Sequence, residues 1–179
     1  MNKKILVACG LLVAGYSMTA SAVSDNTISF QGEVTDETCS LTVNGNETAP
    51  IILLPTVATS DLAASGDVIG ATTFEMALSG CTGSTDDSTT ISTVFAGNLV
   101  ETTNGTLGNT GTAANVTVQI LDTAGEPIDL SSTYTAEGDL TLAAGDTAST
   151  ATYTARYYAT DVATAGTVAA SLQYAVTYQ

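Results

Sequence analysis

The side chains of this sequence that could do chemistry are eighteen carboxylates and three cysteines, and there is no histidine among the 179 residues. Without an imidazole, the commonest base that activates a nucleophile is missing. Two carboxylates alone can hydrolyse a glycosidic bond, but Asp86-Asp87 and Glu126 lie in turn-like contexts, and no tryptophan is present to stack on a sugar. The sequence therefore predicts neither an enzyme nor a bound cofactor.

Cys39 and Cys81 are predicted to form a disulfide bond. Cys9 lies in a segment that we expect to be removed on export, and an even number of cysteines in an exported chain is typical of disulfide pairing. The bond would close a loop of about 42 residues and stabilise the fold by roughly 4 kcal/mol in a chain-entropy estimate. A zinc site is not expected, because two distant thiolates have no histidine to complete the ligand set.

The first 22 residues have the pattern of a secretory signal peptide. Lys3 and Lys4 precede an apolar run, and Ala20-Ser21-Ala22 ends it with the small residues of a cleavage site. The alternative is a lipoprotein cleavage box at Cys9, but too few apolar residues precede it. We expect an exported chain of 157 residues that starts at Val23 and has no segment inserted in a membrane.

The exported chain is strongly acidic. It has 18 acidic residues and, as its single basic residue, Arg156, which gives a formal charge of −17. Nucleic-acid binding needs a basic surface, and so does attraction to an anionic membrane, so neither partner is expected. We interpret the acidity as a well-solvated, non-adhesive surface.

Apolar residues that alternate with polar ones predict an all-β domain. Turn sequences such as Ser79-Gly80 and Asn104-Gly105 separate the predicted strands, a pattern that favours an antiparallel β-sandwich. Residues 58–64 could hold one helical turn, and residues 122–126 are interpreted as a hairpin turn in preference to a calcium loop. The predicted ladders are Phe74-Met76-Leu78, Ile91-Thr93-Phe95, Val116-Val118-Ile120 and Tyr153-Ala155-Tyr157-Ala159.

Two further ladders lie near the ends of the sequence, where an unpaired strand is a template for another chain. The first consists of Ile28, Phe30, Gly32 and Val34. The second consists of Val168, Ala170, Leu172, Tyr174, Val176 and Tyr178. We therefore expect the pairing of these two strands to underlie the function.

The sequence resembles the major subunits of type 1 fimbriae, which are assembled by the chaperone–usher route. Residues 27–34, with Cys39 seven residues after Gly32, resemble the opening of such a subunit, and Cys81 resembles its second cysteine. Gly166, the fourteenth residue from the C-terminus, and the penultimate Tyr178 resemble the motif that a periplasmic pilus chaperone reads.

This resemblance implies an incomplete immunoglobulin-like β-sandwich that lacks its last strand. The implied parts are a signal peptide at 1–22, an N-terminal donor-strand extension at 23–35 and a pilin domain at 36–179. Ile28, Phe30 and Val34 would be donor side chains, and Gly32 would pass a crowded point; the outermost donor position, near Asn26, is not defined. The implied groove and chaperone-recognition strand consists of Gly166, Val168, Leu172, Tyr174, Val176 and Tyr178.

The implied partners are neighbouring subunits in a homopolymer, a periplasmic pilus chaperone and an outer-membrane usher. The implied location is the cell surface, in a fimbria that supports adhesion. Pilus assembly is itself a standard instance of strand addition at a sheet edge. A self-contained exported β-sandwich that binds carbohydrate or protein as a monomer is the alternative. Such a domain would be stable without a donor segment, whereas a pilin alone would be poorly stable or would self-assemble.

Overall fold

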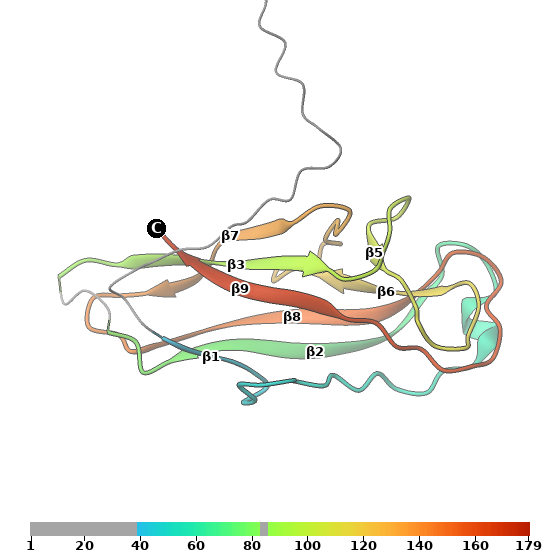
Figure 1. Cartoon of the computed structure of the whole chain (residues 1–179), viewed down its shortest axis with the longest axis horizontal. Helices are drawn as coiled ribbons and strands as arrows, with labels where there is room; N and C mark the ends of the chain where they lie inside the picture. Colours follow the sequence, from blue (N-terminus) through green and yellow to red (C-terminus); the bar gives the residue numbers. More distant parts are fainter. Residues whose placement is uncertain (1–38, 83–85) are drawn as a thin grey trace, which may run out of the picture. The chain divides into compact units, whose positions relative to one another are not determined.

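The computed structural model of the protein describes residues 39–82 and 86–179. These residues form two antiparallel β-sheets and one short 3-10 helix (Figure 1). The predicted all-β fold is therefore confirmed. The predicted signal peptide and donor extension, with Ile28, Phe30, Gly32 and Val34, lie outside the described residues.

The larger sheet has six strands in the order β1-β2-β8-β6-β5-β4. Its alternation follows the predicted ladders, since Phe74, Met76 and Leu78 are buried whereas Glu75 between them is exposed. The strands are β1 (Ser40–Val43), β2 (Val68–Ser79), β4 (Val100–Glu101), β5 (Thr106–Leu107), β6 (Val116–Leu121) and β8 (Ala148–Ala159). β2 and β8 are the longest, and they pair with each other along almost their whole length.

The smaller sheet has three strands in the order β7-β3-β9. They are β3 (Thr89–Gly97), β7 (Tyr134–Leu142) and β9 (Leu172–Tyr178). β3 is the central strand and pairs antiparallel with both neighbours. Its alternate residues Ile91, Thr93 and Phe95 are buried, as the sequence predicted.

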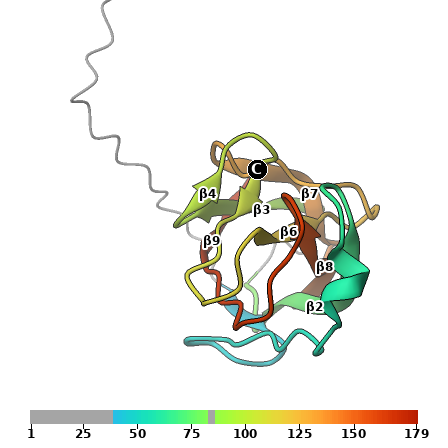
Figure 2. The same ribbon diagram turned by 90° about the vertical axis from the view of Figure 1, so that its right-hand side faces the viewer.

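The core lies between the two sheets, which face one another in the end-on view of Figure 2. Tyr153 of β8 is fully buried at its centre, with its ring stacked on Phe74 at 5.7 Å and meeting Phe95 edge-on at 5.0 Å. Aromatic pairs in these arrangements contribute about 0.5–1.5 kcal/mol each beyond their buried area. This trio therefore joins β2, β3 and β8 across the sandwich.

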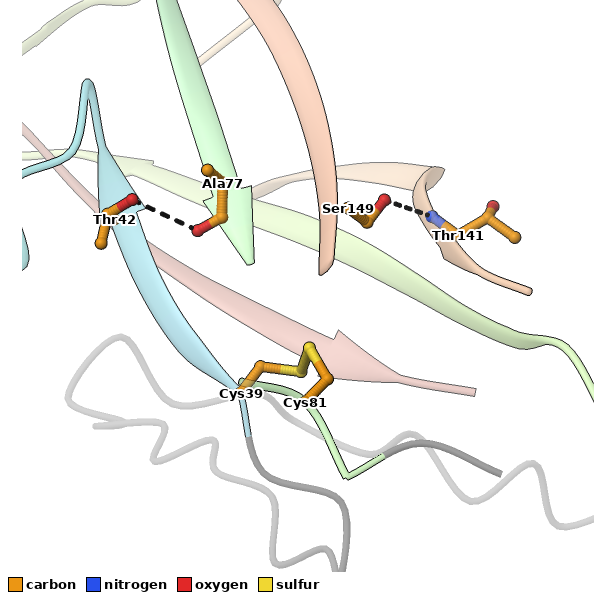
Figure 3. The surroundings of a disulfide bond; sticks show 6 residues. All are labelled: Cys39, Thr42, Ala77, Cys81, Thr141 and Ser149. Atoms are coloured by element: carbon orange, nitrogen blue, oxygen red, sulfur yellow. Dashed lines mark hydrogen bonds between the residues drawn. A yellow bond between two sulfur atoms is a disulfide. The ribbon is translucent and has the colours of Figure 1, made fainter. Parts of the chain in front are cut away.

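Cys39 and Cys81 form the predicted disulfide bond (Figure 3). Cys39 directly precedes β1 and Cys81 closely follows β2, and the register of these strands pairs Ser40 with Ser79. The antiparallel pairing therefore brings the two cysteines together at one end of the sheet.

Two local predictions are confirmed. The helical turn expected within residues 58–64 is the 3-10 helix η1 (Thr59–Leu62). Residues 122–126 form a tight turn in which the Asp122 carboxylate accepts the N–H groups of Ala124 and Glu126, each at 2.9 Å. Among the described residues there is no cluster of three potential metal ligands, and no helix is long and apolar enough to cross a membrane.

The structure also differs from the prediction in two respects. The strand expected from Val168 begins only at Leu172, and residues 168–171 are extended but lie outside the sheet. β7 was not predicted, because Glu137, Gly138 and Asp139 interrupt its apolar alternation. The short strands β1, β4 and β5 were not predicted either.

Candidate strand-acceptor groove

β9 lies at the edge of the three-stranded sheet, and β3 is its one neighbour within the part of the chain that the structure describes. The Gln179 N–H donates to the Thr90 carbonyl at 2.9 Å, and the Asn98 N–H donates to the Ser171 carbonyl at 3.3 Å. In an antiparallel pair, successive residues alternately face the partner and face away from it. The backbone groups of Leu172, Tyr174 and Val176 therefore point away from β3.

The same alternation continues upstream of β9, where residues 109–114 take the place of β3. We call residues 109–114 the strap. The Thr110 N–H donates to the Ala169 carbonyl at 2.8 Å, and the Ala113 N–H donates to the Thr167 carbonyl at 3.0 Å. Thr167 and Ala169 are thus held on the strap side, as Ser171 is held on the β3 side.

One continuous row of backbone groups is left without a partner within residues 39–82 and 86–179. We call this row the acceptor edge. It consists of Val168, Ala170, Leu172, Tyr174 and Val176. A row of unpaired N–H and C=O groups is the feature that accepts an added β-strand.

The side chains of the acceptor edge are partly buried against the core, and so is the side chain of Tyr178. Of the residues between them, Ala169, Ser171, Gln173 and Ala175 are exposed and Thr177 is half-buried. The structure therefore brings together on one face the six alternate residues that the sequence singled out.

A second bank faces the acceptor edge across a groove. It is formed by residues 50–54, which we call the facing segment. Ile52 and Leu54 pack against the core, whereas Ile51 and Leu53 are 79% and 82% exposed. No hydrogen bond joins the facing segment to the rest of the described chain, so this bank also has free backbone groups.

Between the two banks lies a cavity of about 460 Å³. Its floor is apolar and includes Phe74, Phe95, Leu107 and Ile120. The hollow is partly open to solvent, and the side chains of its floor belong to the core between the sheets. An extended apolar segment would fill it with alternate side chains and pair its backbone with the banks.

The described lining of the groove is mostly apolar, which suits binding. It includes no carboxylate, amine or guanidinium group. Its most polar side chains are the phenols of Tyr157 and Tyr174 and the hydroxyl of Ser171. Burial raises the pKa of Tyr157, so this phenol stays neutral.

Gly166 and Tyr178, the two positions of the expected chaperone motif, lie at opposite ends of the acceptor edge. A side chain on Gly166 would overlap the backbone of Thr112 and Ala113 in the strap. Tyr178 pairs with Ile91 at the end of β9. The structure thus gives Gly166 a packing reason to be glycine, which the sequence did not reveal.

Sequence reasoning also missed the facing segment and the strap. The four apolar residues between Pro50 and Pro55 were a usable signal, because such a run needs cover. The strap gave no such signal in the sequence, since its asparagine, threonine, glycine and alanine residues are those of an ordinary loop.

The chain belongs to the fimbrial protein family, whose match spans residues 28–179. It is 37% identical to an F17 fimbrial protein of Escherichia coli, over 99% of each chain. It is 32% identical to the major fimbrial subunit SMF-1 of Stenotrophomonas maltophilia, over 93% of this chain and 99% of that one.

Solved structures share the fold. A chaperone–usher pilus structure aligns with a TM-score of 0.60 at 21% identity, covering 87% of this chain and 96% of the other. The P pilus rod subunit PapA aligns with a TM-score of 0.58 at 21% identity, covering 78% and 99%. The immunoglobulin-like fold expected from the resemblance is thereby confirmed.

The fimbrial-subunit interpretation of the sequence is therefore confirmed at the level of the family. The chain is a structural subunit of a fimbria at the cell surface, and its relatives are fimbrial subunits and not enzymes.

Proposed function

We propose that this subunit polymerises by donor-strand exchange, in which residues 23–35 of one copy fill the groove of the next. Ile28, Phe30 and Val34 would enter the cavity, and Gly32 would pass the point where a side chain does not fit. The observation that carries the proposal is the acceptor edge, where five residues have backbone groups without a partner among the described residues, above an apolar cavity of about 460 Å³.

The expected stabilisation is large. Burying three large apolar side chains contributes roughly 2 kcal/mol each, and each backbone hydrogen bond adds about 0.5–1.5 kcal/mol. The gross gain is on the order of 10 kcal/mol before the cost of ordering the donor. A joint of this strength would dissociate slowly, which makes the fibre kinetically stable.

Before assembly, a periplasmic chaperone would cover the same groove with a strand of its own, and an outer-membrane usher would receive the complex. The segment from Gly166 to Tyr178, which includes β9, would be the part that the chaperone recognises. The mature subunit would then comprise the extension at 23–35 and the pilin domain at 36–179, and the homopolymer would support adhesion.

A peptide that copies residues 26–35 tests the proposal. We expect it to bind the purified mature chain, raise its melting temperature and block its self-assembly, whereas the same peptide with Phe30→Asp should do none of these. A mature chain that is a stable monomer and ignores the peptide would contradict donor-strand exchange and favour the monomeric sandwich.

The variant Gly32→Leu separates polymerisation from folding. We expect it to prevent polymerisation, because the leucine would collide in the groove of the next subunit, and to leave chaperone binding intact. Loss of both properties would indicate a folding defect.

A further inference from the structure

The strap holds the upstream part of the acceptor edge by backbone hydrogen bonds, as β3 holds β9. β3 ends at Gly97, which pairs with Leu172, and the last contact of this side is made by Asn98 with Ser171. Beyond that point Val168 and Ala170 would lack a supporting strand. The strap binds Thr167 and Ala169 between and beside them, so these two residues stay in line with β9.

Asn109 is the central residue of this contact. Its side-chain oxygen accepts the N–H groups of Ala169 at 2.9 Å and Gly111 at 2.7 Å. Its side-chain nitrogen donates to the carbonyls of Ala113 at 2.8 Å and Thr167 at 3.4 Å. One amide group therefore closes the strap on itself and fixes it to the edge.

A second set of contacts is reciprocal. The Thr167 N–H donates to the Thr112 hydroxyl at 2.9 Å, and the Thr112 N–H donates to the Thr167 hydroxyl at 3.1 Å. The two backbones approach so closely that a side chain on Gly111 would overlap Thr167, and one on Gly166 would overlap Ala113. This close approach leaves the upstream end of the edge little freedom to move.

We propose that the strap is a positioning element which extends the strand-accepting edge by two side-chain positions, Val168 and Ala170, and that Asn109 is its key residue. The inference rests on donor-strand addition as the function. The cavity supports it, because Val168 and Ala170 line the cavity together with Leu172 and Tyr174 of β9. Without the strap, the groove would accept a donor only along β9.

The experiment compares donor peptides of different length on the purified mature chain. Fluorescent peptides copying residues 26–35, 26–32 and 29–35 are bound, and their dissociation rates are measured. With the unmodified chain, the longest peptide should dissociate most slowly. With Asn109→Ala, it should dissociate about tenfold faster, the change that corresponds to about 1.4 kcal/mol.

The decisive result is the dependence on length. Of the two shortened peptides, 26–32 and 29–35, one will not reach Val168 and Ala170. Asn109→Ala should leave the dissociation rate of that peptide unchanged and speed the release of the other. If the variant speeds the release of all three peptides equally, or of none, the strap does not position the edge. Thr112→Ala, which removes fewer contacts, should give the same pattern with a smaller change, and it replaces Asn109→Ala if that variant does not fold.

Asn46→Ala is the matched control, because Asn46 lies in the exposed turn after β1 and its side-chain nitrogen also donates to backbone carbonyls. It should change none of the three rates. If no peptide binds the unmodified chain, donor-strand addition itself fails, an outcome that is distinct from peptide binding without length dependence.

Discussion

The two outer strands of the three-stranded sheet, β7 and β9, have edges of opposite character. β9 pairs with β3 in unbroken register from Leu172 to Tyr178 and contains no charged residue. β7 pairs with the other side of β3, but its register shifts between Ile91 and Thr93. One edge is regular and uncharged, and the other is irregular and acidic.

The irregularity in β7 is a bulge formed by Glu137, Gly138 and Asp139. Gly138 has a φ of +65°, which favours glycine. Asp139 fixes the bulge, because its carboxylate accepts the Thr93 N–H at 2.7 Å and the Tyr153 hydroxyl at 2.6 Å. The Asp139 side chain thus binds the Thr93 N–H, a group that regular pairing would have joined to the β7 backbone.

Bulges and charges at an edge hinder the addition of another strand. One sheet can therefore have one edge that is closed to strand addition and one that is open to it. Under the proposed donor-strand exchange, this difference would direct the donor segment to β9 and away from β7.

Leu172→Asp should have the largest effect on the open edge, because it places a charge in the groove. A carboxylate without a partner in an apolar cavity costs several kcal/mol. We expect binding of the 26–35 peptide to weaken by about a thousandfold, which corresponds to about 4 kcal/mol, when measured by fluorescence titration. Gln173→Asp, on the exposed side of the same strand, is the control and should bind normally; equal losses in both variants would contradict the assignment of the groove face.

Asp139→Ala should open the β7 edge and destabilise the fold. The change leaves the Thr93 N–H and the Tyr153 hydroxyl without their acceptor, at a cost of about 3 kcal/mol, to be measured by urea unfolding. We also expect irregular aggregates in electron micrographs. Glu137→Ala should change the stability by less than about 0.5 kcal/mol, because Glu137 is exposed. An Asp139→Ala variant that is as stable as the unmodified chain would show that the carboxylate does not fix the bulge.

Tyr153→Phe tests the hydrogen bond between Tyr153 and Asp139 of the β7 bulge at high pH. Burial, and next the hydrogen bond to Asp139, raise the pKa of Tyr153. The folded phenol thus stays neutral while the unfolded one ionises above about pH 10, so its contribution is present below that pH and is lost as the pH rises further. The variant should lose about 1 kcal/mol at pH 7.

Urea unfolding at pH 8 to 11 is the measurement for this variant. The decline in stability above pH 10 should become shallower, although part of it will remain because burial also raises the pKa values of Tyr134 and Tyr157. An unchanged decline would mean that Tyr153 does not govern the alkaline limit.

The sequence was sufficient for the features that depend on local alternation. The apolar ladder up to Tyr178 has period two, so the face that it presents could be predicted. The disulfide could be predicted from the even number of cysteines in an exported chain. β7 could not, because Glu137-Gly138-Asp139 has the composition of a turn and its bulge is stabilised by Thr93 and Tyr153, far away in the sequence. The same reason applies to the strap, whose Asn109 has partners about 60 residues later.

The disulfide bond has a mechanical consequence for a filament. If a pulling force enters the domain through the residues that precede Cys39, the first strand it meets is β1, which has four residues and would peel away easily. The bond to Cys81 passes the load directly to the end of β2, a strand of twelve residues that is held by β1 on one side and β8 on the other. Reduction of this one bond should therefore lower the force at which a stretched fibre yields.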